Sequence, residues 1–435
     1  MQTNNKILKI AYPRLAPLWI AVFIDILGFS ILIPYLPFFS QEFNAPAWQI
    51  GLLLSTNALF GFFSGPIWGA LSDRRGRKPM LLLSQLGTLA AFLMLAFSNS
   101  MPMLFVSRMV DGIFGGNFPI AKAIIGDVVP PDKRSEQMSN IGVAHVLASL
   151  VGPGLGGLLS RWGIIAPGLV AASLTCLTIL LTLAMLEESN PLARRLSGSG
   201  LAAKAEDGHW GHSQAVEDRP AKGQFRQENV WKNKDARYLL IQWGFHTLSF
   251  MIYISCIALF ANLRLGLDAP QMGRLLMVAG FVRVFVRFAV FVPLRRRLGD
   301  RKTSFIGLGT FVVVFWLLGY VQTQVQFGMV LCAVSFAAAC TRGILTGFLS
   351  RAVKPWEQGR AMGLSASLDS FAQITGPLVG GFILDSLPLW MYGGLASVFA
   401  LGAFLMAFRR FEFHHEKRCL AAKSPPCAQQ IDELA

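Results

Sequence analysis

Charge is scarce in this sequence, and the scarcity is the first guide to its class. Only 14% of the 435 residues are Asp, Glu, Lys or Arg, whereas 53% are hydrophobic. A soluble domain carries roughly 25% charged residues, so this chain has too much apolar surface for an ordinary soluble protein. Its six cysteines show no CxxC spacing and do not form a disulfide framework.

Enzyme motifs are also missing. No GxSxG, Walker, HExxH or GxGxxG pattern stands in a suitable strand-to-helix context. We therefore expect neither an enzyme nor a bound metal or cofactor. Without an ATP site, any active transport has to draw on an ion gradient or on the gradient of the substrate itself.

Long apolar runs are what the sequence has in abundance. A hydrocarbon core of about 30 Å needs about 20 apolar residues per helix, so 435 residues leave room for about a dozen spans. The runs fall at residues 16–38, 48–71, 79–98, 102–123, 136–160, 164–186, 237–262, 270–294, 303–322, 326–350, 358–384 and 388–410. We therefore predict an all-α membrane protein with twelve transmembrane helices. The first run is long enough to span and is interpreted as a retained helix, not a cleaved signal peptide.

The cations that give the chain its net charge of +15 gather in short loops between these runs. Residues 74–78 and 295–302 are the two densest groups, whereas the alternate loops carry little charge. By the positive-inside rule, the basic loops and both termini are cytoplasmic. Attraction to anionic lipid explains this pattern better than binding to nucleic acid, which we do not expect as a partner.

The segment 187–236 divides the spans six and six. It is rich in Gly, Ser and mixed charge, with too little apolar content for a core, so it is predicted to be a flexible cytoplasmic linker. We predict an N-terminal six-helix bundle over 1–186 and a C-terminal six-helix bundle over 237–410. A disordered cytoplasmic tail is expected over 411–435.

A weak internal repeat supports two related halves. The fifth span carries LVGPGLGGLL and the eleventh carries ITGPLVGGFIL. The shared positions are Gly152, Pro153, Gly156 and Gly157 in the first copy and Gly376, Pro377, Gly380 and Gly381 in the second. Small residues allow close helix contact and proline loosens the hydrogen-bond ladder, so these helices are predicted to bend and slide. A single copy would favour an ordinary packing seam, whereas two copies at matching positions favour a transporter.

The loop GALSDRRGRKP, residues 69–79, resembles the loop between helices 2 and 3 of the major facilitator superfamily. The matching positions are Gly69, Leu71, Asp73, Arg74, Gly76, Arg77, Lys78 and Pro79. The resemblance implies the major facilitator fold of two six-helix pseudo-repeat bundles, with helices 1, 4, 7 and 10 lining a central cavity. It also implies that the loop is a cytoplasmic gate in which Asp73 latches helix 2 against helix 11. The corresponding loop PLRRRLGDRKTS, residues 293–304, lacks the Gly-x-x-x-Asp frame, so we expect unequal latches in the two halves.

The first span carries IDILGFSILIPYLPFF, which resembles a pattern of the twelve-helix drug/proton antiporters, including the tetracycline exporters. The matching positions are Asp25, Gly28, Pro34, Leu36 and Pro37. Asp25 lies about 13 Å inside the helix at a rise of 1.5 Å per residue. A carboxylate there is a candidate proton carrier or a counter-charge to a cationic substrate. The structural alternative is a salt bridge to an arginine of a neighbouring helix.

The fourth span and the residues after it, up to Arg134, resemble the antiporter family, with Arg108, Gly112, Asp127 and Arg134 at matching positions. Arg108 and Asp111 are three residues apart, share a helix face and are predicted to pair. Asp111 departs from the family, where a neutral residue is commoner, and is either a second protonatable site or the partner of Arg108; the second interpretation is favoured. Asp127 is expected to pair with the loop cations around Asp73.

The second half adds arginines inside the predicted spans. Arg283 and Arg287 are one turn apart, and Arg287 lies near enough to the helix end to snorkel. Arg283 needs an anion: Asp369, Asp25 or a substrate. Together with Arg342 in the tenth span, these residues argue against a simple cationic substrate.

Histidines offer a further candidate for proton transfer. His145 and His246 lie inside the fifth and seventh spans. They could relay protons near neutral pH, although a satisfied core position is commoner.

These patterns predict a secondary active transporter, with proton-coupled efflux of a small amphipathic compound by alternating access as the main hypothesis. The alternatives are a carrier of an organic anion or anionic metal chelate, and a facilitator-like scaffold that does not transport. Retained charges at Asp25 and Asp73 argue against the scaffold. The expected partners are a small-molecule substrate, protons and the lipid bilayer. We expect a monomer in the inner membrane of a bacterium.

Overall fold

A computed structural model describes residues 15–32, 34–129, 131–189, 230, 233–354 and 357–421. Within these residues the regular structure is helical throughout, with no strand. The chain divides into two compact units. Unit 1 contains residues 1–228 and 261–280, and unit 2 contains 229–260 and 281–435. Most of the predicted linker (190–229) and the last part of the predicted tail (422–435) lie outside the described residues.

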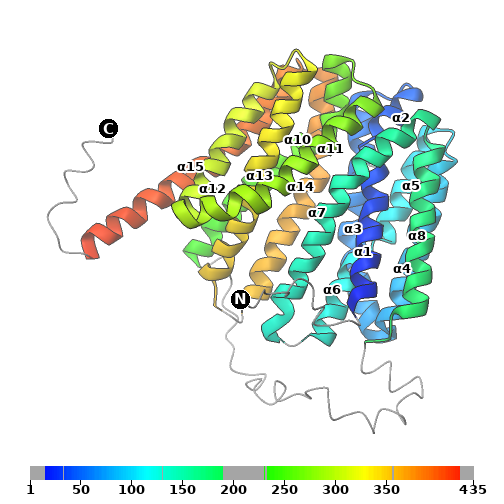
Figure 1. Ribbon diagram of the computed structural model, residues 1–435, viewed down its shortest axis with the longest axis horizontal. Helices are drawn as coiled ribbons and strands as arrows, with labels where there is room; N and C mark the ends of the chain where they lie inside the picture. Colours follow the sequence, from blue (N-terminus) through cyan, green and yellow to red (C-terminus); the bar gives the residue numbers. More distant parts are fainter. Residues whose placement is uncertain are drawn as a thin grey trace, which may run out of the picture. The chain divides into compact units, whose positions relative to one another are not determined.

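Unit 1 is built from helices of the first half of the chain. They are α1 (Ala16–Leu32), α2 (Leu36–Glu42), α3 (Ala47–Arg75), α4 (Arg77–Ala96), α5 (Met101–Ile113), α6 (Asn117–Val128), α7 (Pro131–Leu159), the short η2 (Ser160–Trp162) and α8 (Ile165–Met185). Helix α1 packs against α7 and α8, α3 packs against α5, and α4 packs against α5 and α8. The α1 helix therefore lies inside unit 1, between two neighbours (Figure 1).

Unit 2 uses the second half of the chain. Its helices are α10 (Lys234–Leu265), α11 (Ala269–Phe285), the π-helical turn η5 (Val286–Val290), α12 (Phe291–Leu318), α13 (Gln324–Ala352), α14 (Gln358–Ser386) and α15 (Trp390–Ala421). The last residues of α10 and most of α11 belong to unit 1. Helix α12 packs against α13 and α15.

Two predicted spans are each broken into two helices. The run at 16–38 divides into α1 and α2 around Pro34, because proline lacks the N–H that the helix ladder needs. The run at 102–123 divides into α5 and α6 at Phe114, Gly115 and Gly116, and paired glycines weaken a helix interior. Each run was predicted as one span: the first still forms one candidate span, Pro17–Glu42, whereas neither α5 nor α6 is long enough to span alone.

Two other boundaries also differ from the prediction. Helix α12 runs through the predicted basic loop, but Gly299 within it has a φ of 77°, a conformation that favours glycine and turns the chain. Helix α15 continues to Ala421, so the predicted disordered tail was wrong for 411–421. These eleven residues contain no Gly or Pro and include good helix formers such as Glu, Lys, Arg, Leu and Ala.

Eight helices in the described part of the chain are long and apolar enough to cross a membrane. The difference from the predicted twelve has particular sources. Helices α5 and α6 are each too short, α11 to α12 count as one continuous stretch, and α7 and α14 are not among the eight. Twelve spans therefore remain a prediction, whereas a multi-helix, membrane-type fold is observed.

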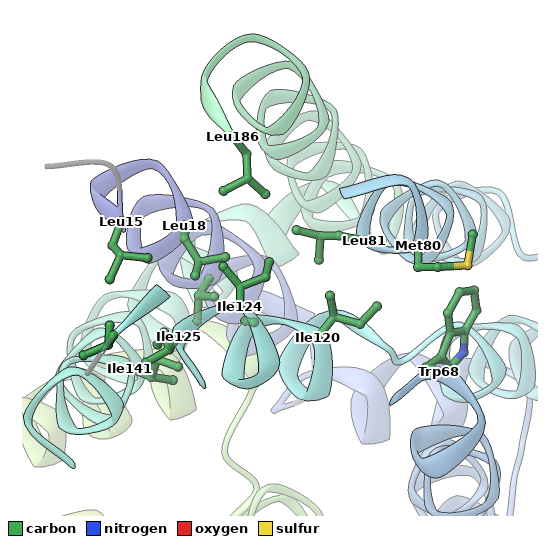
Figure 2. Packing of buried hydrophobic residues seen from close by; sticks show 13 residues of the cluster. Leu15, Leu18, Trp68, Met80, Leu81, Ile120, Ile124, Ile125, Ile141 and Leu186 are labelled. Carbon is green, nitrogen blue, oxygen red and sulfur yellow. The ribbon is translucent and has the colours of Figure 1, made fainter. Parts of the chain in front are cut away.

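A buried apolar cluster holds together the end of unit 1 that carries the basic loop (Figure 2). Its members come from α1, α3, α4, α6 and α7 and from three residues next to helix ends, before α1, after α6 and after α8: Leu15, Leu18, Val22, Trp68, Met80, Leu81, Ile120, Ala121, Ile124, Ile125, Val129, Ile141 and Leu186. Trp68 and Met80 flank the loop in sequence. The basic loop is thus mounted on a close-packed base.

Candidate functional site

Asp25 of α1 is held by two uncharged donors from distant parts of unit 1. Asn117, at the start of α6, donates from Nδ2 to Asp25 Oδ2 at 2.9 Å. The Thr178 hydroxyl of α8 lies 3.2 Å from Asp25 Oδ1. Among the described residues, no cation forms an ion pair with Asp25. The sequence left open a salt bridge between Asp25 and an arginine of a neighbouring helix. The described residues do not form it.

The Thr178 hydroxyl has a second, shorter contact. It lies 2.7 Å from the carbonyl oxygen of Thr175, one turn earlier in α8. A hydroxyl has one proton to donate but can accept in addition. When Thr178 donates to Thr175, its bond to Asp25 needs a proton on the carboxyl group. When Asp25 is ionised, Thr178 has to donate to Asp25 instead, so the two bonds together respond to the protonation of Asp25.

A second buried carboxylate in unit 1 is paired. Arg108 and Asp111 of α5 form the predicted ion pair within the helix, with Nη1 and Oδ2 3.2 Å apart. Asn57 of α3 donates to the same Asp111 oxygen at 2.7 Å. Arg108 is fully buried and lies over the ring of Phe92, 5.9 Å from its centroid. The pairing prediction is confirmed, and Asp111 is the carboxylate that stabilises a buried guanidinium.

Unit 2 contains a carboxylate with a cation. Asp369 of α14 accepts from Arg342 Nη2 of α13 at 2.9 Å. Its other oxygen accepts from Trp243 Nε1 at 3.0 Å and from the Thr247 hydroxyl at 2.7 Å, both in α10. Three helices of unit 2 therefore meet at one side chain, that of Asp369. Asp369 pairs with Arg342 and, among the described residues, forms no ion pair with Arg283, for which it was one of three predicted anions.

Three other candidate residues of unit 2 lie on α10, α11 and η5. His246 is buried, with its ring centroid 5.3 Å from that of Phe311 in α12, as expected of a core histidine. Arg283 is half-buried at the end of α11, and its Nε is buried with no hydrogen-bond partner. Arg287 is exposed in η5, with Cζ 4.9 Å from the centroid of the Phe291 ring. The side chain of His145 lies outside the described residues.

The basic loop of unit 1 is a short turn organised around Arg77. Gly76, with a φ of 102°, is the only residue between α3 and α4. Arg77 pairs with Asp73 at 2.6 Å and, through Nε, with Asp127 of α6 at 2.8 Å. The expected pairing of Asp127 with a loop cation is confirmed. We call Asp73, Arg77 and Asp127 the first clamp.

Other residues of this loop have different surroundings. Glu188, just after α8, accepts from the backbone N–H groups of Arg77 and Lys78 at 2.8 and 3.1 Å. It therefore caps the N-terminus of α4, where a carboxylate is favourable. Lys78 donates from Nζ to the carbonyl of Leu183 at 2.9 Å. Arg74 is exposed, and Gly69 has open space beside it.

Unit 2 contains a corresponding clamp with opposite charges. Gly299 turns the chain as Gly76 does, and the residue after it is Asp300 where unit 1 has Arg77. Asp300 pairs with Arg295 and, at 2.9 Å, with Arg351 at the end of α13. We call these three residues the second clamp. The prediction of unequal latches, based on the missing Gly-x-x-x-Asp frame, missed this charge-reversed copy.

The two glycine–proline motifs occupy matching positions in their units. Helices α7 and α14 run continuously through Pro153 and Pro377. A Cβ on Gly152 would lie 2.4 Å from Ser30 of α1, and one on Gly376 would lie 2.8 Å from Met251 of α10. Both glycines therefore allow the close approach of a neighbouring helix.

The later glycines of these motifs have comparable roles. Gly156 lies against Tyr35, whose hydroxyl donates to the carbonyl of Pro153. Gly380 lies against Cys256, whose thiol lies 3.7 Å from the carbonyl of Pro377. In both copies a neighbouring side chain thus contacts the proline carbonyl. Gly157 lies close to Gly273 of α11, and Gly381 is buried in α14.

Sequence reasoning missed the polar partners of the carboxylates. Asn117 and Thr178 around Asp25, Asn57 beside Asp111, and Thr247 beside Asp369 are ordinary residues in apolar runs. The available signal was a polar side chain in the middle of a predicted span. No group of His, Cys, Asp and Glu in the described part of the chain is arranged to hold a metal ion.

Known proteins resemble the chain along most of its length. The sequence profile of the Major Facilitator Superfamily matches residues 18–292 and 289–425. The class H tetracycline resistance protein of Pasteurella multocida is 27% identical over 383 residues, covering 86% of this chain and 90% of that protein. A homologue of the multidrug resistance efflux pump PmrA from Lactococcus lactis is 25% identical over 416 residues, covering 92% and 96%.

A solved structure shows the same fold. The human organic anion transporter MFSD10 is similar at a TM-score of 0.63 and 23% identity, covering 91% of this chain and 99% of that chain. Profile, relatives and fold agree on one assignment. The chain belongs to the major facilitator superfamily of membrane transporters.

Proposed function

We propose that this protein is a proton-coupled exporter of a small amphipathic compound, with Asp25 as the residue that binds and releases the proton. The observation that carries the proposal is the pair of uncharged donors, Asn117 and Thr178, around a carboxyl group inside α1. In this proposal the chain crosses the inner membrane of a bacterium twelve times, with both termini in the cytoplasm.

The physical argument concerns the cost of charge. An ionised carboxylate inside a span is costly unless it is paired or solvated, and neutral hydrogen bonds offset only part of that cost. Asp25 is therefore sensitive to its surroundings: water access favours the charged form, and closure of the site favours the protonated form. A proton that binds one conformation better than the other shifts the balance between them.

The proton and the substrate can then be coupled through this shared conformational balance. Coupling between two ligands is reciprocal, so a substrate that favours the ionised state promotes release of the proton. The Thr178 hydroxyl, which has alternative bonds to Asp25 and Thr175, supplies a local response to that change. The two clamps, at the ends of helices next to the basic loops, are proposed to stabilise each unit during the movement.

The relatives indicate which compounds to test first. Several are tetracycline resistance proteins or multidrug efflux pumps, which makes tetracycline the first probe. The protein is reconstituted into liposomes that contain tetracycline and a pH-sensitive dye, and a pH gradient is imposed. We expect wild-type protein to move tetracycline against its gradient only when protons flow in the opposite direction.

The decisive variant is Asp25→Asn, which keeps the shape of the side chain but removes the titrating group. Gradient-driven transport is expected to fall to background, while exchange of tetracycline across the membrane without a gradient persists. Asp235→Asn is the matched control, because Asp235 is exposed at the start of α10. If Asp25→Asn transports as strongly as wild type under the gradient, the proton does not travel on Asp25. If tetracycline does not move, the assay is repeated with other amphipathic compounds identified by thermal shift.

A further inference from the structure

Two arginines lie in the middle of the helical stretch from Ala269 to Gly299, in the part of it that belongs to unit 2. Arg283 and Arg287 are one turn apart, in α11 and η5. Arg283 is 14 residues after Ala269 and 16 residues before Gly299, or about 21 and 24 Å along the helix. A guanidinium this far from either end cannot easily reach water by extending its side chain.

Neither arginine has a carboxylate partner in the described part of the chain. The Nε of Arg283 is buried and makes no hydrogen bond. The carboxylate in unit 2 that could have paired with it, Asp369, is already bound to Arg342. A cation inside an apolar helical stretch without a counter-charge is costly, and in membrane proteins such residues often mark substrate or ion pathways.

The local backbone is adapted to these side chains. The turn Val286–Val290 is π-helical, and single π turns in helices occur frequently at functional sites. The ring of Phe291 lies 4.9 Å from Arg287 Cζ and positions that guanidinium by a cation–π contact. Gly343 of α13 lies next to Arg287 Nη1 and has no side chain to occupy the space beside it.

Unit 2 also contains a group of packed aromatic rings on α10 and α12. The Tyr253 ring stacks on Phe315 at a centroid distance of 5.0 Å and contacts Phe250 at 6.1 Å. A cation and aromatic rings in the same unit suit a ligand with an anionic group on an apolar body.

We propose that Arg283 and Arg287 bind the anionic group, a carboxylate, sulfonate or phosphate, of an amphipathic molecule. The charges support this choice: of Arg283, Arg287 and Arg342, only Arg342 pairs with a carboxylate, Asp369, and the other two have no counter-charge among the described residues. The role in substrate binding rests on the proposed transport function. The anion itself is carried either by a transported solute or by a lipid headgroup.

The test measures binding, which does not depend on transport. The full chain is placed in nanodiscs of phosphatidylcholine and titrated calorimetrically with 2-naphthoate, and with the uncharged 2-naphthamide as the matched ligand. We expect saturable binding of the acid and at least about tenfold weaker binding of the amide, because a charge-assisted hydrogen bond contributes more than a neutral one. Arg283→Gln is expected to weaken binding of the acid at least about tenfold.

Three further variants make the result specific. Arg297→Gln removes an exposed arginine of the same helical stretch and should bind like wild type. Arg283→Lys keeps the charge but loses the planar fork, and should bind between wild type and Arg283→Gln. Asp25→Asn should lose gradient-driven transport but still bind the acid more tightly than the amide, so failure of proton coupling and failure of the anion site give different results.

A second bilayer composition distinguishes a lipid headgroup from a transported solute as the source of the anion. If a headgroup is the natural anion, phosphatidylglycerol in the nanodisc raises the thermal denaturation midpoint of wild type but not of Arg283→Gln, and it competes with 2-naphthoate. If a solute is the natural anion, 2-naphthoate binds equally well in both bilayers. The proposal is overturned if acid and amide bind alike, or if Arg283→Gln responds to 2-naphthoate and phosphatidylglycerol as wild type does.

Discussion

Asp25 in unit 1 and Asp369 in unit 2 are both carboxylates inside helices, but their partners differ. Asp25 has Asn117 and Thr178, which are uncharged. Asp369 has Trp243 and Thr247 and, in addition, Arg342 at 2.9 Å. The two sites differ by one cation. Arg342 compensates the charge of Asp369, and no cation among the described residues does so for Asp25.

This difference assigns distinct roles to similar residues. A carboxylate paired with an arginine is stable in its charged form and can fix helix positions. A carboxylate with only neutral donors has to lose or gain a proton when its surroundings change. We therefore expect unit 1 to respond to protons, and unit 2 to present fixed charge to a substrate.

The clamps extend the comparison to the basic loops. In unit 1 one arginine, Arg77, pairs with two aspartates. In unit 2 one aspartate, Asp300, pairs with two arginines. Arg77 and Asp300 each directly follow a glycine with positive φ. The position after the glycine is thus paired with two opposite charges in each unit, with the signs exchanged between units.

The largest expected effect comes from giving Asp25 the cation that Asp369 has. Asn117→Arg places a guanidinium beside Asp25 and should keep the carboxylate ionised. Gradient-driven transport is expected to fall to background, as measured in the liposome assay. Asn117→Gln, which remains neutral, should retain coupling. If Asn117→Arg transports normally, the absence of a cation at Asp25 has no functional meaning.

The next largest effect concerns the buried pair of unit 1. Asp111→Asn leaves the fully buried Arg108 without its ion pair, and breaking a buried pair costs about 3–5 kcal/mol. A marked fall in the thermal denaturation midpoint in detergent is the expected result. Arg342→Gln is the comparison in unit 2: Arg342 is 57% exposed, so we expect a loss below about 1 kcal/mol. Equal losses would contradict the difference in burial.

The glycine–proline motifs should respond alike, because their packing is alike. Gly152→Ala and Gly376→Ala each place a Cβ within 3 Å of a neighbouring helix. Overpacking of this kind costs about 1–3 kcal/mol. Thermal denaturation of both variants measures the losses, and Gly363→Ala is the control, since a Cβ there meets open space. Stabilities that differ strongly between Gly152→Ala and Gly376→Ala would show that the two seams are not equivalent.

The clamps are expected to give the smallest effects. Arg77 is only 10% exposed, so Arg77→Gln should cost about 1–2 kcal/mol. The arginines of the second clamp are 53% and 61% exposed, so Asp300→Asn should cost less than about 1 kcal/mol. Thermal denaturation at low and high salt distinguishes the two clamps, because salt screens exposed ion pairs more strongly than buried ones. A larger loss in Asp300→Asn than in Arg77→Gln would reverse this ranking.

Much of the fold could be predicted from the sequence because apolar runs and basic loops report directly on the membrane. The motif around Asp73 indicated the family, and the family is confirmed. The helix breaks at Pro34 and at Gly115 and Gly116 were missed, although the residues that cause them are local signals. Span length alone was given too much weight over these breaks.

The candidate sites could be predicted only in part, since pairing depends on contacts between distant segments. The ion pair of Arg108 with Asp111 follows from helix spacing and was foreseen. The bond between Thr178 and Asp25 joins residues 153 positions apart, which no local pattern specifies. The choice of Arg342 as partner of Asp369 likewise depends on how α13 and α14 pack.

The central claim is that Asp25 is the carboxyl group that changes its protonation during transport. Infrared difference spectroscopy of the protein in lipid, recorded between acidic and alkaline pH, detects the protonated carboxyl directly. We expect one carboxyl band that disappears on raising the pH, is missing in Asp25→Asn and persists in Asp369→Asn. A band that persists in Asp25→Asn and is lost in Asp369→Asn would contradict the account.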